Sequence, residues 1–162
     1  MSKKTTITII LFLLLTTLLL ESCTLSNRTS SSSGTGWGNG VFDSNGERIY
    51  FTATSDRGTE ITYTGGPSSN GWMMGGGGLL ACASCHGPDG RGGVHSMGMM
   101  QQMDAKDIRW KTLEGEFDTE KFRLAVEEGK DPDGTQLSTD MPRWKMSDGD
   151  ISDLIDYLNT LP

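Results

Sequence analysis

The sequence predicts an all-α domain, and three stretches support this fold class. Residues 118–129 and residues 147–162 each begin with a helix cap and continue with apolar residues at helical spacing. Residues 82–86, which read Cys-Ala-Ser-Cys-His, place two thiols and an imidazole on one helical turn. The chain of 162 residues is long enough for one domain and additional segments. We therefore expect one helical domain at residues 41–162.

The first 22 residues have the pattern of an export signal. Lys3 and Lys4 form a basic start, and residues 7–20 are apolar apart from threonines. A run of this length is typical of a signal peptide core and is too short to span a bilayer comfortably. We expect residues 1–22 to be a signal peptide.

The signal ends in Leu-Glu-Ser-Cys, which resembles the lipobox of bacterial lipoproteins. This resemblance implies cleavage between Ser22 and Cys23 and acyl chains on Cys23, which would hold the protein on a membrane surface. Plain secretion is the alternative. The residue two positions after the cysteine is Leu25 rather than aspartate, which favours the outer membrane. We expect the protein on the periplasmic side of a bacterial membrane.

Residues 23–40 are rich in serine and glycine, a composition typical of a flexible tether. The net charge of the chain is −7 at pH 7, and loss of the signal makes it one unit more negative because two lysines and one glutamate are removed. An acidic surface argues against nucleic acid and anionic lipid as partners. It favours docking to a basic patch on another protein.

The segment between the tether and the cysteines is less clearly patterned. Residues 43–54 fit a short capped helix, but their central Ile-Tyr-Phe-Thr also fits a strand. Residues 55–81 contain many turn formers, and residues 59–64 alternate like a strand. We expect this strand to pair locally in a hairpin.

Two helices near the C-terminus have clear boundaries. The first begins after Asp118 as N-cap and ends at Gly129. The second begins at Ser147, and Asp150 completes its S-x-x-D cap. Residues at helical spacing form their apolar faces: Phe122, Ala125, Val126, Ile151, Leu154, Ile155 and Leu158.

The pattern of Cys82, Cys85 and His86 is that of covalent c-type haem attachment. Two thiols three positions apart can each form a thioether with one haem vinyl group, and the next residue then places its imidazole at the iron. A redox-active disulfide is one alternative. A structural zinc site that uses both cysteines and His95 is another, although such sites usually have four ligands.

The chain resembles the monohaem, class I-like cytochrome c family. The resemblance is carried by CASCHGPDGRGG at residues 82–93 and by MPRWKMSDGDISDLIDYLNTL at residues 141–161. It implies a helical fold around one covalently bound haem c, with His86 as the proximal iron ligand and Met141 as the distal one. The family's first helix usually runs almost directly into the cysteine motif, whereas here residues 55–81 form an insertion.

The same resemblance implies two sets of contacts. The second ring nitrogen of His86 is expected to donate a hydrogen bond to a backbone carbonyl, which would fix the orientation of the imidazole. The first and last helices are expected to meet through Tyr50, Phe51, Tyr157 and Leu158.

The distal ligand has rivals among the nine methionines. Pro142 follows Met141 and would restrict the loop that presents its sulfur. Met146 and the methionines of residues 95–103 are the alternatives, and any methionine can instead fill a gap in a core. We expect Met146 to have that packing role.

Several other residues are expected to lie near the haem. Trp110 and Trp144 are candidates to pack against it and to hydrogen-bond a propionate. Arg91, Arg109 and Arg143 are candidate propionate partners. Residues 95–103, HSMGMMQQM, are expected to form a loop that covers the haem, and copper binding by their soft ligands is the alternative.

These expectations describe a one-electron carrier rather than an enzyme, with redox proteins as partners that carry a basic docking patch. Two other classes stay open. A haem sensor or peroxidase would have an open sixth position on the iron, and a methionine-rich copper-binding protein would use residues 95–103. Whether the carrier is mobile or a fixed subunit of a larger complex also stays open.

Overall fold

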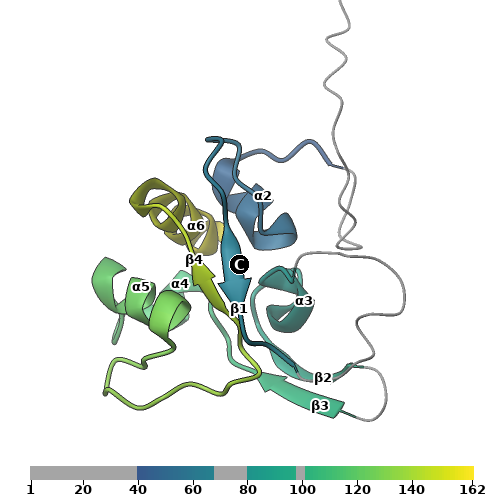
Figure 1. Cartoon of the computed structure of the whole chain (residues 1–162), viewed down its shortest axis with the longest axis vertical. Coiled ribbons are helices and arrows are strands. Elements are labelled where there is room, and N and C mark those ends of the chain that lie inside the picture. Colours follow the sequence, from purple (N-terminus) through teal and green to yellow (C-terminus); the bar gives the residue numbers. More distant parts are fainter. Residues whose placement is uncertain (1–39, 68–79, 98–100) are drawn as a thin grey trace, which may run out of the picture. The chain divides into compact units, whose positions relative to one another are not determined.

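The computed structural model describes residues 40–67, 80–97 and 101–162 (Figure 1). Of residues 95–97 and 101 it describes the backbone alone. The predicted signal, Cys23 and tether lie outside the described residues. The elements in chain order are α2 (Asn45–Thr52), β1 (Thr62–Thr64), α3 (Ala83–His86), β2 (Gly93–Met97), β3 (Gln101–Ala105), α4 (Trp110–Leu113), α5 (Thr119–Glu128), β4 (Arg143–Lys145) and α6 (Asp148–Thr160).

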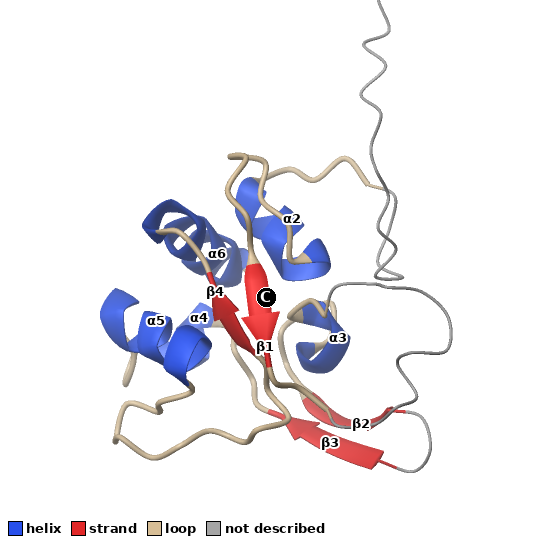
Figure 2. Ribbon diagram, viewed as in Figure 1, coloured by secondary structure: helices blue, strands red, loops and turns tan. Residues whose placement is uncertain are grey.

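Helices form the framework of the described residues, but the prediction of an all-α domain was incomplete. Four strands form two antiparallel pairs, β1 with β4 and β2 with β3 (Figure 2). Each strand has only three to five residues, which is too short to give a clear alternating pattern in the sequence. No helix in the described ranges is long and apolar enough to cross a membrane.

Residues 43–54, which fitted either a helix or a strand, form helix α2. The hydroxyl of Ser44 accepts a hydrogen bond from the backbone N–H of Glu47 at 3.1 Å, which caps the first turn. Ala53 ends the helix in a left-handed conformation, and its N–H donates to the carbonyl of Ile49 at 2.8 Å. Local capping therefore decides between the two alternatives.

Helices α2 and α6 lie against each other, as Figure 1 shows, and Gly46 lies at their contact. A β-carbon at Gly46 would lie 1.9 Å from the carbonyl oxygen of Asp153, so this contact requires glycine. One turn further on, the ring centroids of Tyr50 and Tyr157 are 5.2 Å apart, and those of Phe51 and Tyr157 are 6.2 Å apart. The predicted contact between the first and last helices is confirmed.

Helices α5 and α6 begin where their caps predicted. The carboxylate of Asp118 accepts from the N–H of Lys121 at 2.8 Å, and the hydroxyl of Ser147 accepts from the N–H of Asp150 at 3.2 Å. Gly129 ends α5 with a φ of 70°, a left-handed conformation that favours glycine.

Strand β1 exists within the predicted residues, but the expectation of a local hairpin was wrong. Its partner is β4, about eighty residues later in the chain, and the register pairs Tyr63 with Trp144 and Thr64 with Arg143. The rings of Tyr63 and Trp144 lie 6.3 Å apart between centroids, so the distant strand supplies an aromatic neighbour. The segment before the cysteine motif is therefore joined to the segment that follows Met141.

Strands β2 and β3 pair from Gly93 opposite Ala105 to Met97 opposite Gln101. Residues 95–103 were expected to form a loop, and that prediction was wrong for the strand residues among them. The proposed copper ligands cannot be tested against the fold, because residues 98–100 and the side chains of 95–97 lie outside the described part. The side chain of Met103 in β3 is buried, at 7% exposure.

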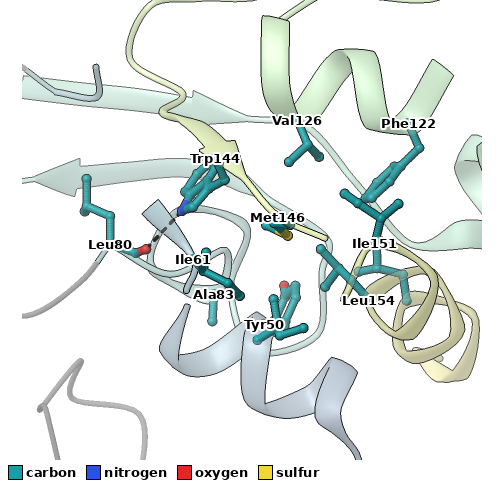
Figure 3. Close-up of a cluster of buried hydrophobic side chains, with 12 residues drawn as sticks. Tyr50, Ile61, Leu80, Ala83, Phe122, Val126, Trp144, Met146, Ile151 and Leu154 are labelled. Atoms are coloured by element: carbon teal, nitrogen blue, oxygen red, sulfur yellow. Dashed lines mark hydrogen bonds between the residues drawn. The ribbon is translucent and has the colours of Figure 1, made fainter. Parts of the chain in front are cut away.

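The apolar core lies between α2, α5, α6 and β4 (Figure 3). Phe122 and Val126 of α5 pack in it, as the sequence predicted. Met146 is also a core residue, at 7% exposure, which confirms its expected packing role. The remaining members come from α2, α3, α6, β4 and the loops: Ile49, Tyr50, Ile61, Leu80, Ala83, Trp144, Ile151, Leu154 and Leu158.

A fully buried carboxylate joins residues 55–59 to the helical framework. Asp150 at the start of α6 is 0% exposed and accepts hydrogen bonds from the hydroxyls of Ser55, Thr59 and Ser147 and from the amide of Asn45. Burial alone would raise the pKa of Asp150, but these four hydrogen bonds outweigh it and lower the pKa to about 2. The carboxylate is therefore charged and holds residues 55–59 against α6.

Candidate functional site

Four side chains that the sequence singled out line one cavity. It has a volume of about 720 Å³, and Cys82, Cys85, His86 and Met141 all contribute to its lining. This volume falls within the range of sites that enclose a cofactor or a small molecule. The fold therefore brings the cysteine motif and the C-terminal loop to the same place.

The walls of this cavity are mostly apolar. Met103 of β3 and Trp144 of β4 contribute to them, and both are buried. Such a lining keeps water away from a bound group and favours a large apolar ring system. The other large aliphatic and aromatic lining residues are Leu80, Ile108, Leu113, Phe117, Phe122, Val126, Leu137, Leu154 and Leu158.

Cys82 is the N-cap of the single-turn helix α3, and Cys85 lies within it. The N–H groups of Cys85 and His86 both donate to the carbonyl of Cys82, at 3.2 and 2.9 Å. Cys82 and Cys85 are not joined to each other, so both carry free thiols. One helical turn therefore presents two thiols and an imidazole to the cavity.

Both thiols are protonated at neutral pH. Burial raises the pKa of the Cys82 thiol to about 12, and burial together with the negative charge of Asp140 raises the pKa of Cys85. In a redox-active cysteine pair the pKa of the attacking thiol is usually lowered instead. The surroundings of these cysteines thus disfavour a thioredoxin-like role and are compatible with thioether formation.

The imidazole of His86 is oriented by a backbone carbonyl. Its Nδ1 lies 2.7 Å from the carbonyl oxygen of Lys106, and since a carbonyl only accepts, Nδ1 carries the proton. The side chain is buried, at 9% exposure. The predicted hydrogen bond from His86 to a backbone carbonyl is therefore present.

The glycine-rich turn after the motif makes this hydrogen bond possible, which the sequence analysis did not foresee. Gly92 has a φ of 68°, and its N–H donates to the carbonyl of His86 at 2.9 Å. A β-carbon at Gly92 would lie 2.1 Å from the carbonyl oxygen of Ala105 and 2.5 Å from that of Lys106. The close approach of these two backbone segments brings Lys106 to the imidazole.

Tyr50 supports the same turn from the opposite side. Its hydroxyl donates to the carbonyl of Gly87 at 2.6 Å, and burial raises the pKa of the phenol. The side chain is 0% exposed and joins α2 to the residue that follows His86. A buried tyrosine in an otherwise apolar helix face is the sequence signal that could have indicated a hydrogen-bonding role.

Met141 is the methionine of the C-terminal loop that lines the cavity. Its side chain is partly buried against the core, and the Pro142 that follows it is fully buried. Met146 packs in the core and is not among the lining residues. Met103 is a lining residue, so one of the predicted rivals also reaches the cavity.

The three arginines predicted near a propionate are engaged elsewhere. Arg91 pairs with Asp89 at 3.1 Å, and Arg109 pairs with Asp107. Arg143 donates to backbone carbonyls, and none of the three lines the cavity. Neighbouring carboxylates and carbonyls satisfy these guanidinium groups locally.

Of the two tryptophans expected to pack beside the haem, Trp144 lines the cavity and Trp110 does not. The indole N–H of Trp144 donates to the carbonyl of Leu80 at 3.4 Å (Figure 3). Trp110 packs edge-on against Phe122 with ring centroids 5.9 Å apart. Lys106 is the cation that the lining does contain.

Carboxylates are numerous at the cavity. They include Asp140, which lies close enough to Cys85 to raise its pKa, and Asp107, whose pKa Arg109 lowers to about 2. The sequence showed a net negative charge, but it did not show that several of the acidic residues line this cavity. The other acidic lining residues are Asp104, Glu116 and Asp131.

The comparisons with known proteins agree with this arrangement. The model of the cytochrome c family matches residues 76–162, more than half of the chain, and this range includes the cysteine motif and the Met141 loop. Neither the curated proteins nor the solved structures contained a match. The chain therefore belongs to the cytochrome c family, whose members bind covalently attached haem c and transfer electrons.

Proposed function

We propose that this protein carries single electrons with one haem c per chain, held by Cys82 and Cys85 and ligated by His86 and Met141. The observation that supports this most directly is that these four side chains line one apolar cavity. When bound, haem c supplies an iron that changes by one electron between its ferric and ferrous states.

The chain's own residues have separate tasks in this proposal. Cys82 and Cys85 hold the group through two thioethers, which keeps it attached outside the cytoplasm. His86 donates its Nδ1 proton to Lys106, so Nε2 is the nitrogen that would bind iron. The sulfur of Met141 would bind on the other side, and a thioether ligand raises the reduction potential.

The apolar walls would keep water from the iron, and this reduces the rearrangement that accompanies electron transfer. Phe117, Phe122 and Leu154 belong to these walls. Two cysteines on one helical turn, one oriented imidazole and a thioether fit a haem c better than they fit a structural zinc ion, which usually takes four thiolate or imidazole ligands.

We further propose that the chain is exported and anchored through acyl chains on Cys23, with residues 23–40 as a tether. The export pattern of residues 1–22 and the lipobox support this. The side chains around the cavity carry a negative charge, which supports a redox partner with a basic docking patch. Nucleic acid is disfavoured for the same reason.

A haem-stain gel, a pyridine haemochrome spectrum and an intact mass test this proposal on protein produced with a cytochrome c maturation system. We expect one covalent haem per chain, a spectrum of two thioethers, and the mass of an acylated chain that begins at Cys23. Extraction of the haem by acidified acetone would contradict covalent attachment. An unmodified Cys23 would contradict the anchor alone.

The absorption spectrum separates the carrier from a sensor or peroxidase. A low-spin ferric spectrum with the weak far-red band of methionine ligation is expected, together with a ferrous form that does not bind carbon monoxide. A high-spin spectrum and ready binding of carbon monoxide would instead indicate an open sixth position.

A further inference from the structure

Arg143 is the first residue of β4 and follows the Met141–Pro142 pair. Its guanidinium donates to the carbonyl of Leu137 at 2.9 Å, to that of Ser138 at 3.2 Å, and to that of Met141. Three carbonyls of one short loop therefore converge on one cation. Such charge-assisted hydrogen bonds are stronger than neutral ones.

The position of this guanidinium is fixed from two sides. A β-carbon at Gly129 would lie 2.1 Å from Arg143 Cζ, so the guanidinium rests directly on the backbone that ends α5. The backbone of Arg143 pairs with Thr64 of β1. Arg143 therefore connects the end of α5, the insertion and the loop.

Gly66 contacts the same loop from the insertion. Its N–H donates to the carbonyl of Thr139 at 3.3 Å, and its φ of 103° favours glycine. A β-carbon at Gly66 would lie 3.2 Å from Pro142 Cγ and 3.1 Å from Leu80 Cδ1. Gly66 thus lies between the residue after Met141 and the start of the cysteine motif.

Neither residue lines the cavity, so neither is expected to touch the haem. We infer that Arg143 and Gly66 are positioning residues that hold the loop of residues 137–142 so that the Met141 sulfur faces the iron. This inference rests on the proposed function, in which Met141 is the distal ligand. It also assigns a role to the insertion, whose strand β1 and Gly66 brace the loop.

A neutral thioether is a weak iron ligand, so its bond depends on the loop around it. If the loop opens locally, the sulfur leaves and water or another ligand can bind. Hydrogen bonds to Leu137, Ser138, Thr139 and Met141 exist in the closed loop, and each one lost favours opening. A variant without the guanidinium should therefore loosen the methionine bond more than it affects the rest of the fold.

The experiment compares the unmodified holoprotein with Arg143→Met, which keeps a long apolar chain but no donors, and Arg143→Lys, which keeps the charge. The control is Arg57→Met, which removes the ion pair between Arg57 and Asp153 at 2.7 Å, at the other end of the insertion. The far-red methionine band and the affinity of the ferric protein for imidazole are measured. Thermal unfolding is followed in parallel.

We expect imidazole to bind about tenfold more tightly to Arg143→Met than to the unmodified protein, because removal of charge-assisted hydrogen bonds favours the open loop. When the pH is raised, the far-red band of the variant should disappear at a lower pH than that of the unmodified protein. Arg143→Lys should lie between this variant and the unmodified protein. Arg57→Met should leave both spectroscopic measures unchanged even where its unfolding temperature falls.

Gly66→Ala provides a second test if Arg143→Met does not accumulate as holoprotein, and it should also raise the imidazole affinity. Unchanged imidazole affinity and an unchanged far-red band in Arg143→Met or, failing that, in Gly66→Ala would overturn the inference. An equal effect of Arg57→Met would do the same. Absence of the band from the unmodified protein, or its persistence in Met141→Ala, would instead overturn the proposed function.

Discussion

Nδ1 of His86 lies 2.7 Å from the carbonyl oxygen of Lys106, and Gly92 allows the two segments to approach this closely. In the proposed function His86 is the proximal ligand, and this hydrogen bond would increase the basicity of the imidazole and so stabilise ferric iron. The local backbone geometry around one carbonyl would thus contribute to the reduction potential of the whole protein.

Gly92→Ala should raise the reduction potential, because its β-carbon would push the backbone of Ala105 and Lys106 away and weaken this hydrogen bond. It should also lower the free energy of unfolding by about 2 kcal/mol or more, since overpacking adds to strain at a positive φ. A spectroelectrochemical titration and thermal unfolding measure the two effects. Gly93→Ala is the control, because Gly93 also has a positive φ, 106°, but its β-carbon would meet nothing within 4 Å. A potential shift of equal size in both variants would contradict this account.

Met141→Ala should abolish the far-red band and allow the ferrous protein to bind carbon monoxide. Its reduction potential should fall, since a thioether favours ferrous iron. Met146→Leu is the matched control, because Met146 packs in the core; it should keep the spectrum and cost less than about 1.5 kcal/mol of stability. Exchanged phenotypes for these two variants would identify Met146 as the ligand. Retention of the far-red band in both variants would instead indicate Met103, which also lines the cavity, as the ligand.

Asp150→Asn should remove part of the acid sensitivity of the fold. The pKa of Asp150 in the folded protein is about 2, below its usual 3.8, so the carboxylate stabilises the fold above about pH 4 and loses this effect as the pH falls toward 2. We expect the variant to be less stable by about 2 kcal/mol at pH 7 and nearly equal to the unmodified protein near pH 2. Denaturant unfolding across this pH range measures the difference.

Asp148→Asn is the control for this experiment, since the Asp148 side chain lies in the same helical turn but is 89% exposed. Its effect should stay below about 1 kcal/mol, as for other exposed ion pairs. A constant difference between Asp150→Asn and the unmodified protein from pH 7 to pH 2 would show that Asp150 acts through packing rather than charge.

Gly46→Ala should destabilise the contact of α2 and α6. A β-carbon at Gly46 would overlap the backbone of Asp153, and the helices would have to separate at a loss of about 3 kcal/mol or more. Thermal unfolding of the holoprotein measures this loss. Gly115→Ala, whose β-carbon would meet nothing within 4 Å, should change stability by less than about 0.5 kcal/mol. Similar unfolding temperatures for the two variants would contradict a close contact.

The features that the sequence predicted depend on interactions between residues close together in the chain. The Cys82–His86 spacing follows from one helical turn, and the caps at Asp118 and Ser147 follow from hydrogen bonds within four residues. The assignment of Met141 depended on resemblance to the cytochrome c family, because nothing local separates it from Met103, which lines the same cavity.

The features that the sequence did not predict depend on distant residues. Nothing in residues 59–64 indicates that their partner is β4, and nothing in Arg143 indicates three carbonyl acceptors. The local ion pairs of Arg91 and Arg109 could have been predicted, because each residue follows an aspartate by two positions.

The two N-terminal elements find their partners among the last residues of the domain, α2 with α6 and β1 with β4. A chain that leaves a translocation channel N-terminus first cannot close either contact until its C-terminal residues have arrived. If the chain is exported as proposed, we expect the Cys82–His86 turn to stay accessible for haem attachment throughout that interval, so that the order of emergence itself keeps the thiols open for modification.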